Sequence, residues 1–179
     1  MKRRLVLKQI ALTSAAMWLL PSCITDPKKL SIALQHLSIT GDEEELVGDI
    51  ADVIVPVTDT PGARAVGAHL FALIMVDDCL SKKDQELYLK GMRSFDETVN
   101  TVIGKSFAKG SQEERLKVLE QLDQHPDKFS DDVKFFYAKT RAYILQGYLS
   151  SEHFLTHVKP YQLIPGAHFN GCVPVSNKI

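Results

Sequence analysis

The amino-acid sequence predicts an all-α protein: an irregular bundle of about five helices with an extended Pro/Gly-rich C-terminal arm, preceded by a signal peptide. Three observations favour this fold class. Apolar residues recur at helical spacing behind polar capping residues, and no segment alternates like a β-strand for more than a few residues. Prolines and glycines then interrupt regular structure after residue 158. We expect an export signal, a lipidated tether, a helical domain and an arm over residues 1–22, 23–40, 41–158 and 159–179.

The composition fits one compact domain and gives no sign of a nucleic-acid partner. The chain has 179 residues, of which 45% are hydrophobic and 24% charged, and its formal net charge is −1. The charge is uneven, because four basic residues precede the first acidic one, Asp26; they are Lys2, Arg3, Arg4 and Lys8. A basic leader in front of a mildly acidic body indicates targeting.

The leader has the parts of an export signal in the right order. The basic segment 1–8 is followed by the uncharged stretch 10–20, which suits a signal peptide and is too short to span a bilayer. Leu20-Pro21-Ser22-Cys23 resembles a lipobox, so we expect Cys23 to carry the lipid anchor. The competing interpretation, a buried N-terminal helix with an incidental cysteine, leaves the agreement of charge, length and cysteine position unexplained.

Arg3 and Arg4 also fit a twin-arginine signal. They are followed by Leu5-Val6-Leu7-Lys8, a hydrophobic segment and then a lysine. That route carries folded cargo, often with a partner attached, although paired arginines also occur in ordinary basic leaders.

Two helices are expected in the first half of the domain. Thr40-Gly41-Asp42-Glu43-Glu44 has capping side chains and acids suited to a helix start, and Pro56 ends that helix. The composition of residues 57–62 predicts a turn. A second helix from about Ala63 to Leu80 is apolar on most sides and is therefore expected at the centre of the bundle, with Asp77 and Asp78 pointing apart and solvating its end.

Three further helices complete the domain. Ser81 is expected to cap a long helix that ends near Gly104, and Ser111 to begin a near capping box for a short helix broken at Pro126. Residues 131–149 form the last strong helix, after which Ser150-Ser151-Glu152 caps one or two further turns.

The search for an active site finds no catalytic constellation. The sequence has no dinucleotide fingerprint, phosphate loop, nucleophile elbow or haem-attachment motif. With Cys23 lipidated, Cys79 and Cys172 remain, too few thiolates for an iron–sulfur cluster held by this chain alone. The sequence leaves open whether these two cysteines pair together, stay free or pair with a partner.

Three histidines are weak candidates for a metal site. His153 and His157 lie four residues apart and would share a helix face, whereas His69 lies in the apolar helix. Solvated or core histidines are the commoner outcome in such positions. The arm poses a different question, because its apolar side chains must pack on the bundle or on another protein; they are Tyr161, Leu163, Ile164, Phe169 and Val173.

The sequence resembles the gluconate 2-dehydrogenase subunit 3 family. The most specific feature is the run Thr58-Asp59-Thr60-Pro61-Gly62-Ala63, preceded by Ile54-Val55-Pro56-Val57. The resemblance continues through Gly67-Ala68-His69, Gly147-Tyr148-Leu149-Ser150-Ser151-Glu152, Pro165-Gly166 and Phe169-Asn170-Gly171-Cys172. These segments bracket residues 46–173.

The resemblance implies a non-catalytic subunit without a cofactor of its own. Its partner would be a large flavoprotein of the glucose–methanol–choline oxidoreductase type that holds FAD, often joined by a cytochrome c subunit. The small subunit would stabilise the flavoprotein and carry it through the membrane to the periplasmic side. Arg3 and Arg4 would direct export and Cys23 would anchor the complex.

The same resemblance suggests a partner interface in two places. Asp59, Thr60, Pro61 and Gly62 would shape the first, a loop between helices. The arm would lie along the flavoprotein through Tyr161, Pro165, Gly166, Phe169 and Cys172, with Cys172 the better candidate for an intersubunit disulfide. Cys79 lies inside an apolar helix, and we expect it to be a small buried residue. The alternative function is a stand-alone periplasmic metal- or ligand-binding lipoprotein that uses the three histidines.

Overall fold

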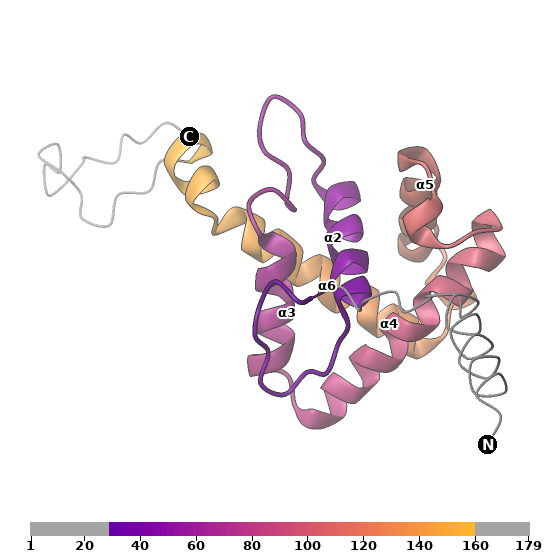
Figure 1. Ribbon diagram of the computed structural model, residues 1–179. Helices are drawn as coiled ribbons and strands as arrows, with labels where there is room; N and C mark the ends of the chain where they lie inside the picture. Colours follow the sequence, from indigo (N-terminus) through magenta and orange to yellow (C-terminus); the bar gives the residue numbers. More distant parts are fainter. Residues whose placement is uncertain (1–28, 160–179) are drawn as a thin grey trace, which may run out of the picture.

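The computed structural model describes residues 29–159, and this part of the chain is helical without a strand (Figure 1). It contains the α-helices α2 (Gly41–Ile54), α3 (Ala68–Cys79), α4 (Lys82–Ile103), α5 (Gln112–Gln124) and α6 (Asp131–Leu149). Short 3-10 turns η1 (Phe107–Lys109) and η2 (Pro126–Lys128) flank α5, and the π-helix η3 (Phe154–Val158) follows α6. The all-α prediction is confirmed. The expected signal, lipidation site and arm lie outside the described residues.

Three of the predicted helix starts are confirmed by their capping bonds. Thr40 and Ser111 each form a complete capping box with the glutamate three residues later, Glu43 and Glu114. Ser81 accepts a hydrogen bond from the Asp84 amide at the start of α4. Each cap satisfies amide groups that the first helical turn leaves without a partner.

The predicted start of the second helix is wrong by five residues. Residues 63–67 form turns, and α3 begins at Ala68. Gly67 has a φ of +74°, a left-handed conformation that cannot occur inside a right-handed helix. The Gly67 amide bonds back to the Arg64 carbonyl, and this closes the turn ahead of α3.

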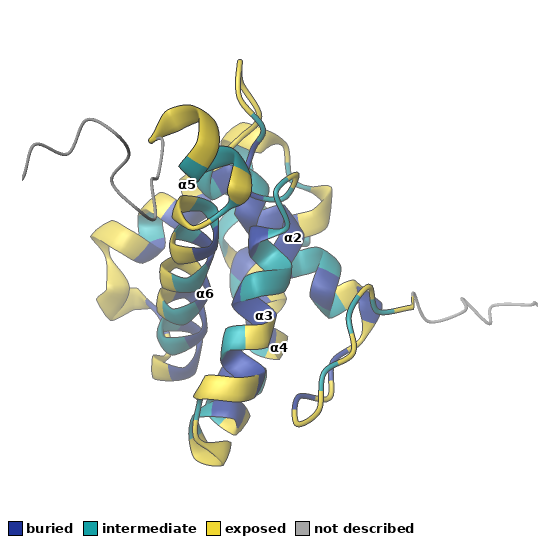
Figure 2. Cartoon of the chain, turned by 90° about the vertical axis from the view of Figure 1, so that its left-hand side faces the viewer, coloured by how far each residue is buried: buried dark blue, intermediate teal, exposed yellow. Residues whose placement is uncertain are grey.

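The prediction that this helix is central is also wrong, because α6 occupies the centre. Helix α6 packs along α4 and α3 and also contacts α2 (Figures 1 and 2). Helix α3 is buried on one side only, and Ile74 on its outer side is 41% exposed. A helix that is apolar on all sides can be buried on all sides, but its sequence does not show whether the same chain or another subunit packs on each side.

Helices α4 and α6 approach closely at Gly91. A Cβ atom there would lie 2.1 Å from the Asp132 carbonyl oxygen, so no larger residue fits without moving α6. Beside this contact, edge-to-face pairs join Tyr88 to Phe136 and Phe95 to both Phe136 and Phe107, with ring centroids 5.0–5.5 Å apart. This aromatic seam forms the middle of the core.

The described part of the tether, residues 29–39, is fixed against the helices without regular secondary structure. We call this segment the strap. Leu37 and Ile39 are buried, and Leu30, Ile32 and Leu34 pack partly buried against the core. This part of the expected tether therefore packs on the folded domain through five apolar residues.

Asp77 holds the strap in place through three backbone hydrogen bonds. Its carboxylate accepts the amides of Gln35, His36 and Leu37 at 2.7, 2.8 and 2.5 Å. The side chain is 4% exposed, so the expectation that it solvates the helix end is wrong. Burial alone would raise the Asp77 pKa, but these three donors hold the pKa below its ordinary value.

Candidate functional site

The loop after α2 projects from one end of the molecule (Figure 1). Residues 56–60 are exposed, and Val57 keeps 66% of its surface accessible. The base of the loop is closed by a hydrogen bond from the Ala63 amide to the Val55 carbonyl at 2.9 Å, and its tip by one from the Thr58 amide to the Thr60 carbonyl at 3.1 Å. The loop therefore has a defined backbone conformation, which these two hydrogen bonds hold.

The four predicted loop residues have two different roles. Asp59 and Thr60 are exposed and can meet a partner, whereas Pro61 is half-buried and Gly62 is buried. A Cβ at position 62 would lie 2.6 Å from the Val55 carbonyl oxygen, so glycine is required for the return of the chain. Gly62 shapes the loop rather than presenting a contact.

An ionic network under the loop fixes it to α2. The Arg64 guanidinium bonds to Glu45, to Asp49 at 3.0 Å and to Asp52 at 3.4 Å. Arg115 of α5 reaches the other Asp49 oxygen at 3.3 Å. Burial raises the Asp49 pKa, and the two arginines partly offset that rise. Sequence reasoning missed Arg64; the acids at positions 45, 49 and 52, on nearly one helix face, were the available signal.

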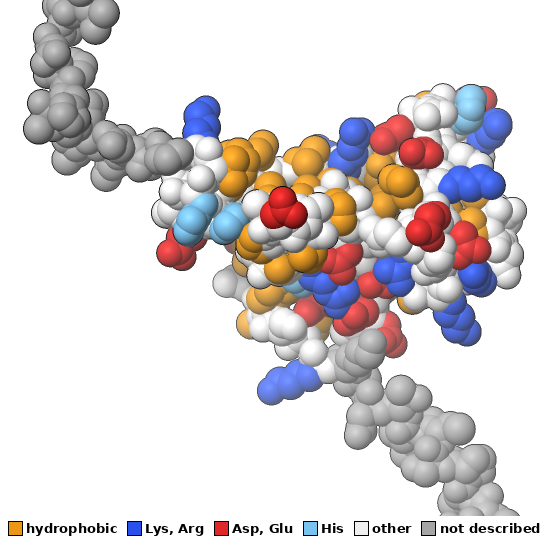
Figure 3. Space-filling view, turned by 90° about the horizontal axis from the view of Figure 1, so that it is seen from above, with side chains coloured by type: hydrophobic (Ala, Val, Ile, Leu, Met, Phe, Trp, Pro, Cys, Tyr) orange, Lys and Arg blue, Asp and Glu red, His pale blue; other side chains and the backbone are white. Residues whose placement is uncertain are grey.

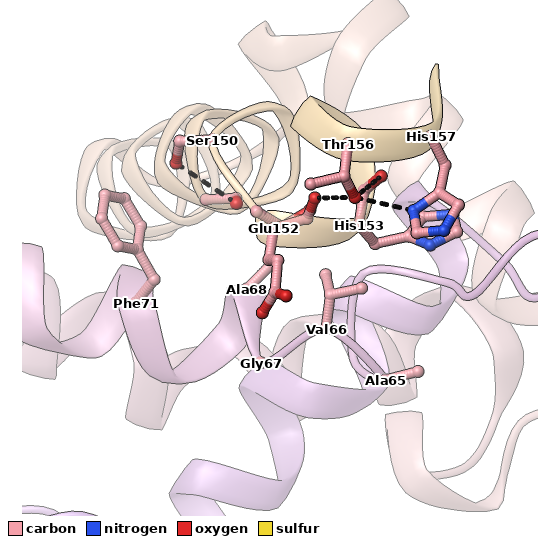
Figure 4. A pocket seen from close by; sticks show the side chains of 12 residues that line it. Ala65, Val66, Gly67, Ala68, Phe71, Ser150, Glu152, His153, Thr156 and His157 are labelled. Carbon is pink, nitrogen blue, oxygen red and sulfur yellow. Dashed lines mark hydrogen bonds between the residues drawn. The ribbon is translucent and has the colours of Figure 1, made fainter. Parts of the chain in front are cut away.

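A pocket of about 560 Å³ lies near the base of the same loop (Figure 4). The start of α3 and the turn before it supply Ala65 to Ala68 and Phe71 to its lining, and the end of α6 with η3 supplies the rest. Those residues are Gly147, Ser150, Ser151, Glu152, His153, Thr156 and His157. Small side chains thus face a rim of hydroxyl, carboxylate and imidazole groups.

Two of the three candidate histidines meet in this pocket. The His153 and His157 rings stack with centroids 4.9 Å apart and an interplanar angle of 17°. Thr156 Oγ1 lies 2.7 Å from His157 Nδ1, and the buried Nε2 of His153 has no hydrogen-bond partner. Stacked rings direct their nitrogens along parallel planes, which does not suit two ligands of one metal ion.

His69 does not join this pair. It is absent from the pocket lining, its Nδ1 is buried without a partner, and burial followed by the charge of Arg64 lowers its pKa. Among residues 29–159, one group of three potential ligands comes together: His36, Asp77 and Asp78. Asp77 in that group already holds the strap, and the predicted separation of Asp77 from Asp78 is wrong.

Exposed apolar side chains occur mainly on the loop after α2, on α3 and near the end of α6. The outer face of α3 presents Ile74, and the end of α6 and η3 present Leu149 and Val158, each about half exposed. Figure 3 views this end of the molecule and shows hydrophobic side chains spread beside a pair of histidines, with charged side chains concentrated on the other side. Such a surface suits a protein partner better than a small substrate.

Cys79 is the cysteine that the structure describes, and it is an exposed free thiol. The expectation from the sequence was that this thiol would be a small buried residue, and that is wrong, because Cys79 lies on the uncovered side of α3. No helix within residues 29–159 is long and apolar enough to cross a membrane.

The described residues form a helical scaffold with a projecting loop and an adjacent pocket at one end. A sequence model of the family described as gluconate 2-dehydrogenase subunit 3 matches residues 41–166. The chain belongs to the gluconate 2-dehydrogenase subunit 3 family, as its resemblance predicted. By that name, the family is one subunit of a multi-subunit dehydrogenase. Comparisons with curated proteins and with solved structures give no match.

Proposed function

We propose that this chain is the accessory, non-catalytic small subunit of a membrane-associated FAD-dependent sugar or polyol dehydrogenase such as gluconate 2-dehydrogenase. In this function it stabilises the catalytic flavoprotein, is exported with it and anchors it on the periplasmic side of a bacterial membrane. The FAD belongs to the flavoprotein, of the glucose–methanol–choline type, which a cytochrome c subunit often accompanies in complexes of this kind.

The observation that carries this proposal is the incomplete cover of α3. The helix has apolar residues on most sides, yet its Ile74 side stays open and Phe71 and Met75 are only half-buried. A solvent-exposed helix in a stable domain normally has a polar outer face. An apolar outer face is typical of a subunit interface, where a partner completes the burial.

The loop and the arm extend the interface in this proposal. The exposed loop carrying Asp59 and Thr60 stands next to the start of α3. The family match runs to Gly166, so the first part of the arm, including Tyr161 and Pro165, belongs to the family unit. We place the arm along the flavoprotein, where Phe169 packs and Cys172 forms an intersubunit disulfide.

The proposal is tested by affinity isolation of the chain from detergent-solubilised membranes, with an absorption spectrum of the eluate. We expect a co-eluting large protein with the visible absorbance of oxidised flavin. A clean monomer without flavin, under conditions that preserve other complexes, would contradict the proposal. Metal bound stoichiometrically to that monomer would instead favour the lipoprotein that uses histidine ligands.

A pair of matched variants locates the interface. Ile74→Asp places a charge on the open face of α3, whereas Leu116→Asp does so on α5 at a similarly exposed apolar residue. We expect Ile74→Asp to reduce flavoprotein recovery at least tenfold and Leu116→Asp to leave it within twofold. Circular dichroism melting of both variants separates lost binding from lost folding.

A further inference from the structure

The strap is attached to the helices at two places on one end of the molecule. The Ser31 amide bonds to Glu44 in the first turn of α2 at 2.9 Å, and residues 35–37 bond to Asp77 near the end of α3. Arg93 of α4 adds a bond to the Ser38 carbonyl at 3.2 Å. We call the start of α2, the end of α3 and the strap between them the strap end.

The projecting loop and the pocket lie at the opposite end. Helix α2 has 14 residues and therefore spans about 21 Å from its strap-end start to the base of the loop. Helix α3 runs back the other way, from the pocket at Ala68 to Asp77 (Figure 1). We call this second end, with residues 56–62 and the pocket, the loop end.

The distance between the proposed lipid and the strap is short. Seven residues lie between Cys23 and Ser31, so the eight steps from one to the other reach at most about 28 Å when fully extended. If the loop end faced the membrane, the distance of Ser31 from the bilayer would increase by about the combined length of α2 and the loop. The linker would then have to be stretched fully alongside the body, at a high cost in chain entropy.

We propose that the strap orients the protein, holding the strap end against the lipid headgroups and directing the loop end away from the membrane. This inference rests on the proposed lipid anchor at Cys23. The strap end suits a headgroup layer because its surface is polar: Gln35, His36 and Ser38 are exposed on the strap. The charges at this end are mixed. Lys82 and Lys83 are exposed just beyond the end of α3, and so are Asp42 at the start of α2 and Asp78 near the end of α3.

The consequence concerns where the flavoprotein binds. The loop end becomes the membrane-distal side of the subunit, and the open face of α3 runs along its flank from there toward the strap end. The catalytic partner is then held at a distance from the bilayer set by α2, instead of lying between this subunit and the lipid.

The orientation is tested with the lipidated protein in liposomes that contain headgroup-nitroxide lipids. One protein keeps Cys79 as its labelling site, with Cys172→Ser; the other carries Thr58→Cys with Cys79→Ala and Cys172→Ser. A fluorophore on Cys79 lies at the strap end, two residues from Asp77, and one on residue 58 lies at the loop end. We expect quenching at least threefold stronger at Cys79. Equal quenching, or stronger quenching at residue 58, overturns the orientation.

Two further measurements separate the possible failures. Sedimentation with liposomes reports the anchor alone: protein that stays in solution overturns the lipid anchor and the orientation together. Asp77→Asn removes the carboxylate that holds the strap. This variant should still sediment with the liposomes, but the difference in quenching between the labels on Cys79 and residue 58 should decrease at least twofold. Its control, Asp78→Asn, should keep the full difference. An unchanged difference in Asp77→Asn would mean that the strap does not set the orientation.

Discussion

At the scale of single residues, the most informative side chain is Asp77, because it joins two segments about forty residues apart. The three amides that it receives belong to a strap with no helix or strand of its own. Without this carboxylate the three amides would lose their partner, at a cost of about 1–3 kcal/mol where water cannot replace it, as at the buried Leu37 amide. Asp77 is therefore the main polar contact that holds the middle of the strap to the folded domain.

Because of Asp77, the free energy of unfolding should decrease as the pH is lowered. The pKa of Asp77 in the folded state lies below its ordinary value, so its contribution to stability is complete above about pH 5 and is lost as the pH falls through the folded-state pKa. We expect the free energy of unfolding of Asp77→Asn to fall less between pH 5 and pH 2 than that of the unaltered protein. Urea titrations at each pH measure this.

The matched control for that experiment is Asp78→Asn, the exposed neighbour on the same helix. It should retain the acid sensitivity of the unaltered protein. Hydrogen exchange provides a second measurement, because the amides of Gln35, His36 and Leu37 should exchange faster in Asp77→Asn alone. Unchanged protection of these three amides would contradict the role assigned to Asp77.

Elements are positioned by contacts of two kinds, and the first is steric. Gly91 lets α4 touch the backbone of α6, where a Cβ would lie 2.1 Å from Asp132 O. Gly91→Ala should therefore lower the free energy of unfolding by about 2–3 kcal/mol, because the overpacked helices must separate. Glu97→Ala on the exposed side of α4 should change it by less than about 0.5 kcal/mol. Urea denaturation compares the two, and equal stabilities would disprove the close approach.

The second kind of contact is ionic and fixes the loop to α2. Arg64→Ala leaves Glu45, Asp49 and Asp52 without their shared cation and should cost about 1–3 kcal/mol, since the guanidinium is only partly buried. Arg141→Ala, which breaks one exposed pair with Asp123, should cost less than about 1 kcal/mol. The test is again urea denaturation, with proteolysis of the 56–62 loop as a local measurement. A loss in Arg64→Ala no greater than in Arg141→Ala would contradict the network.

Elements also show how far the sequence alone could predict this protein. Local signals were sufficient where a side chain acts within a few residues, as in the caps of Thr40, Ser81 and Ser111. They were insufficient where the deciding contact is distant. Asp77 and the strap meet across forty residues, and the Arg64 network joins a turn to two helices.

The candidate site likewise has some features that the local sequence predicts and others that it does not. The exposure of Asp59 and Thr60 followed from their turn composition, and the further helical turn after α6 from the caps that precede it. That this turn is a π-helix did not follow from the sequence. The open face of α3 did not follow, because an apolar helix has the same sequence whether its own chain or another subunit covers it. Gly67 could have indicated the late start of α3, but a glycine in an apolar run does not reveal its φ.

For the whole molecule, the leader predicts a spectroscopic property of the mature protein. Trp18 is the one tryptophan among 179 residues and lies before Cys23. Cleavage at the lipobox should therefore give a membrane-extracted protein with tyrosine emission and no indole emission. Intact mass before and after globomycin-type inhibition of lipoprotein processing provides the control. Indole fluorescence from the purified mature form would show that the leader had been retained.

The central position of α6 has a consequence for the time at which this protein can fold. Among the α-helices that the structure describes, α6 is synthesised after α2, α3 and α4, whose core residues have no common packing surface until it emerges. The proposed export signal, by contrast, precedes all of them in the sequence. The signal is thus exposed throughout synthesis while the body is still unfolded, and the bundle closes only near the end of translation. An export route that accepts only folded cargo would then act on the finished subunit, after α6 has joined the core.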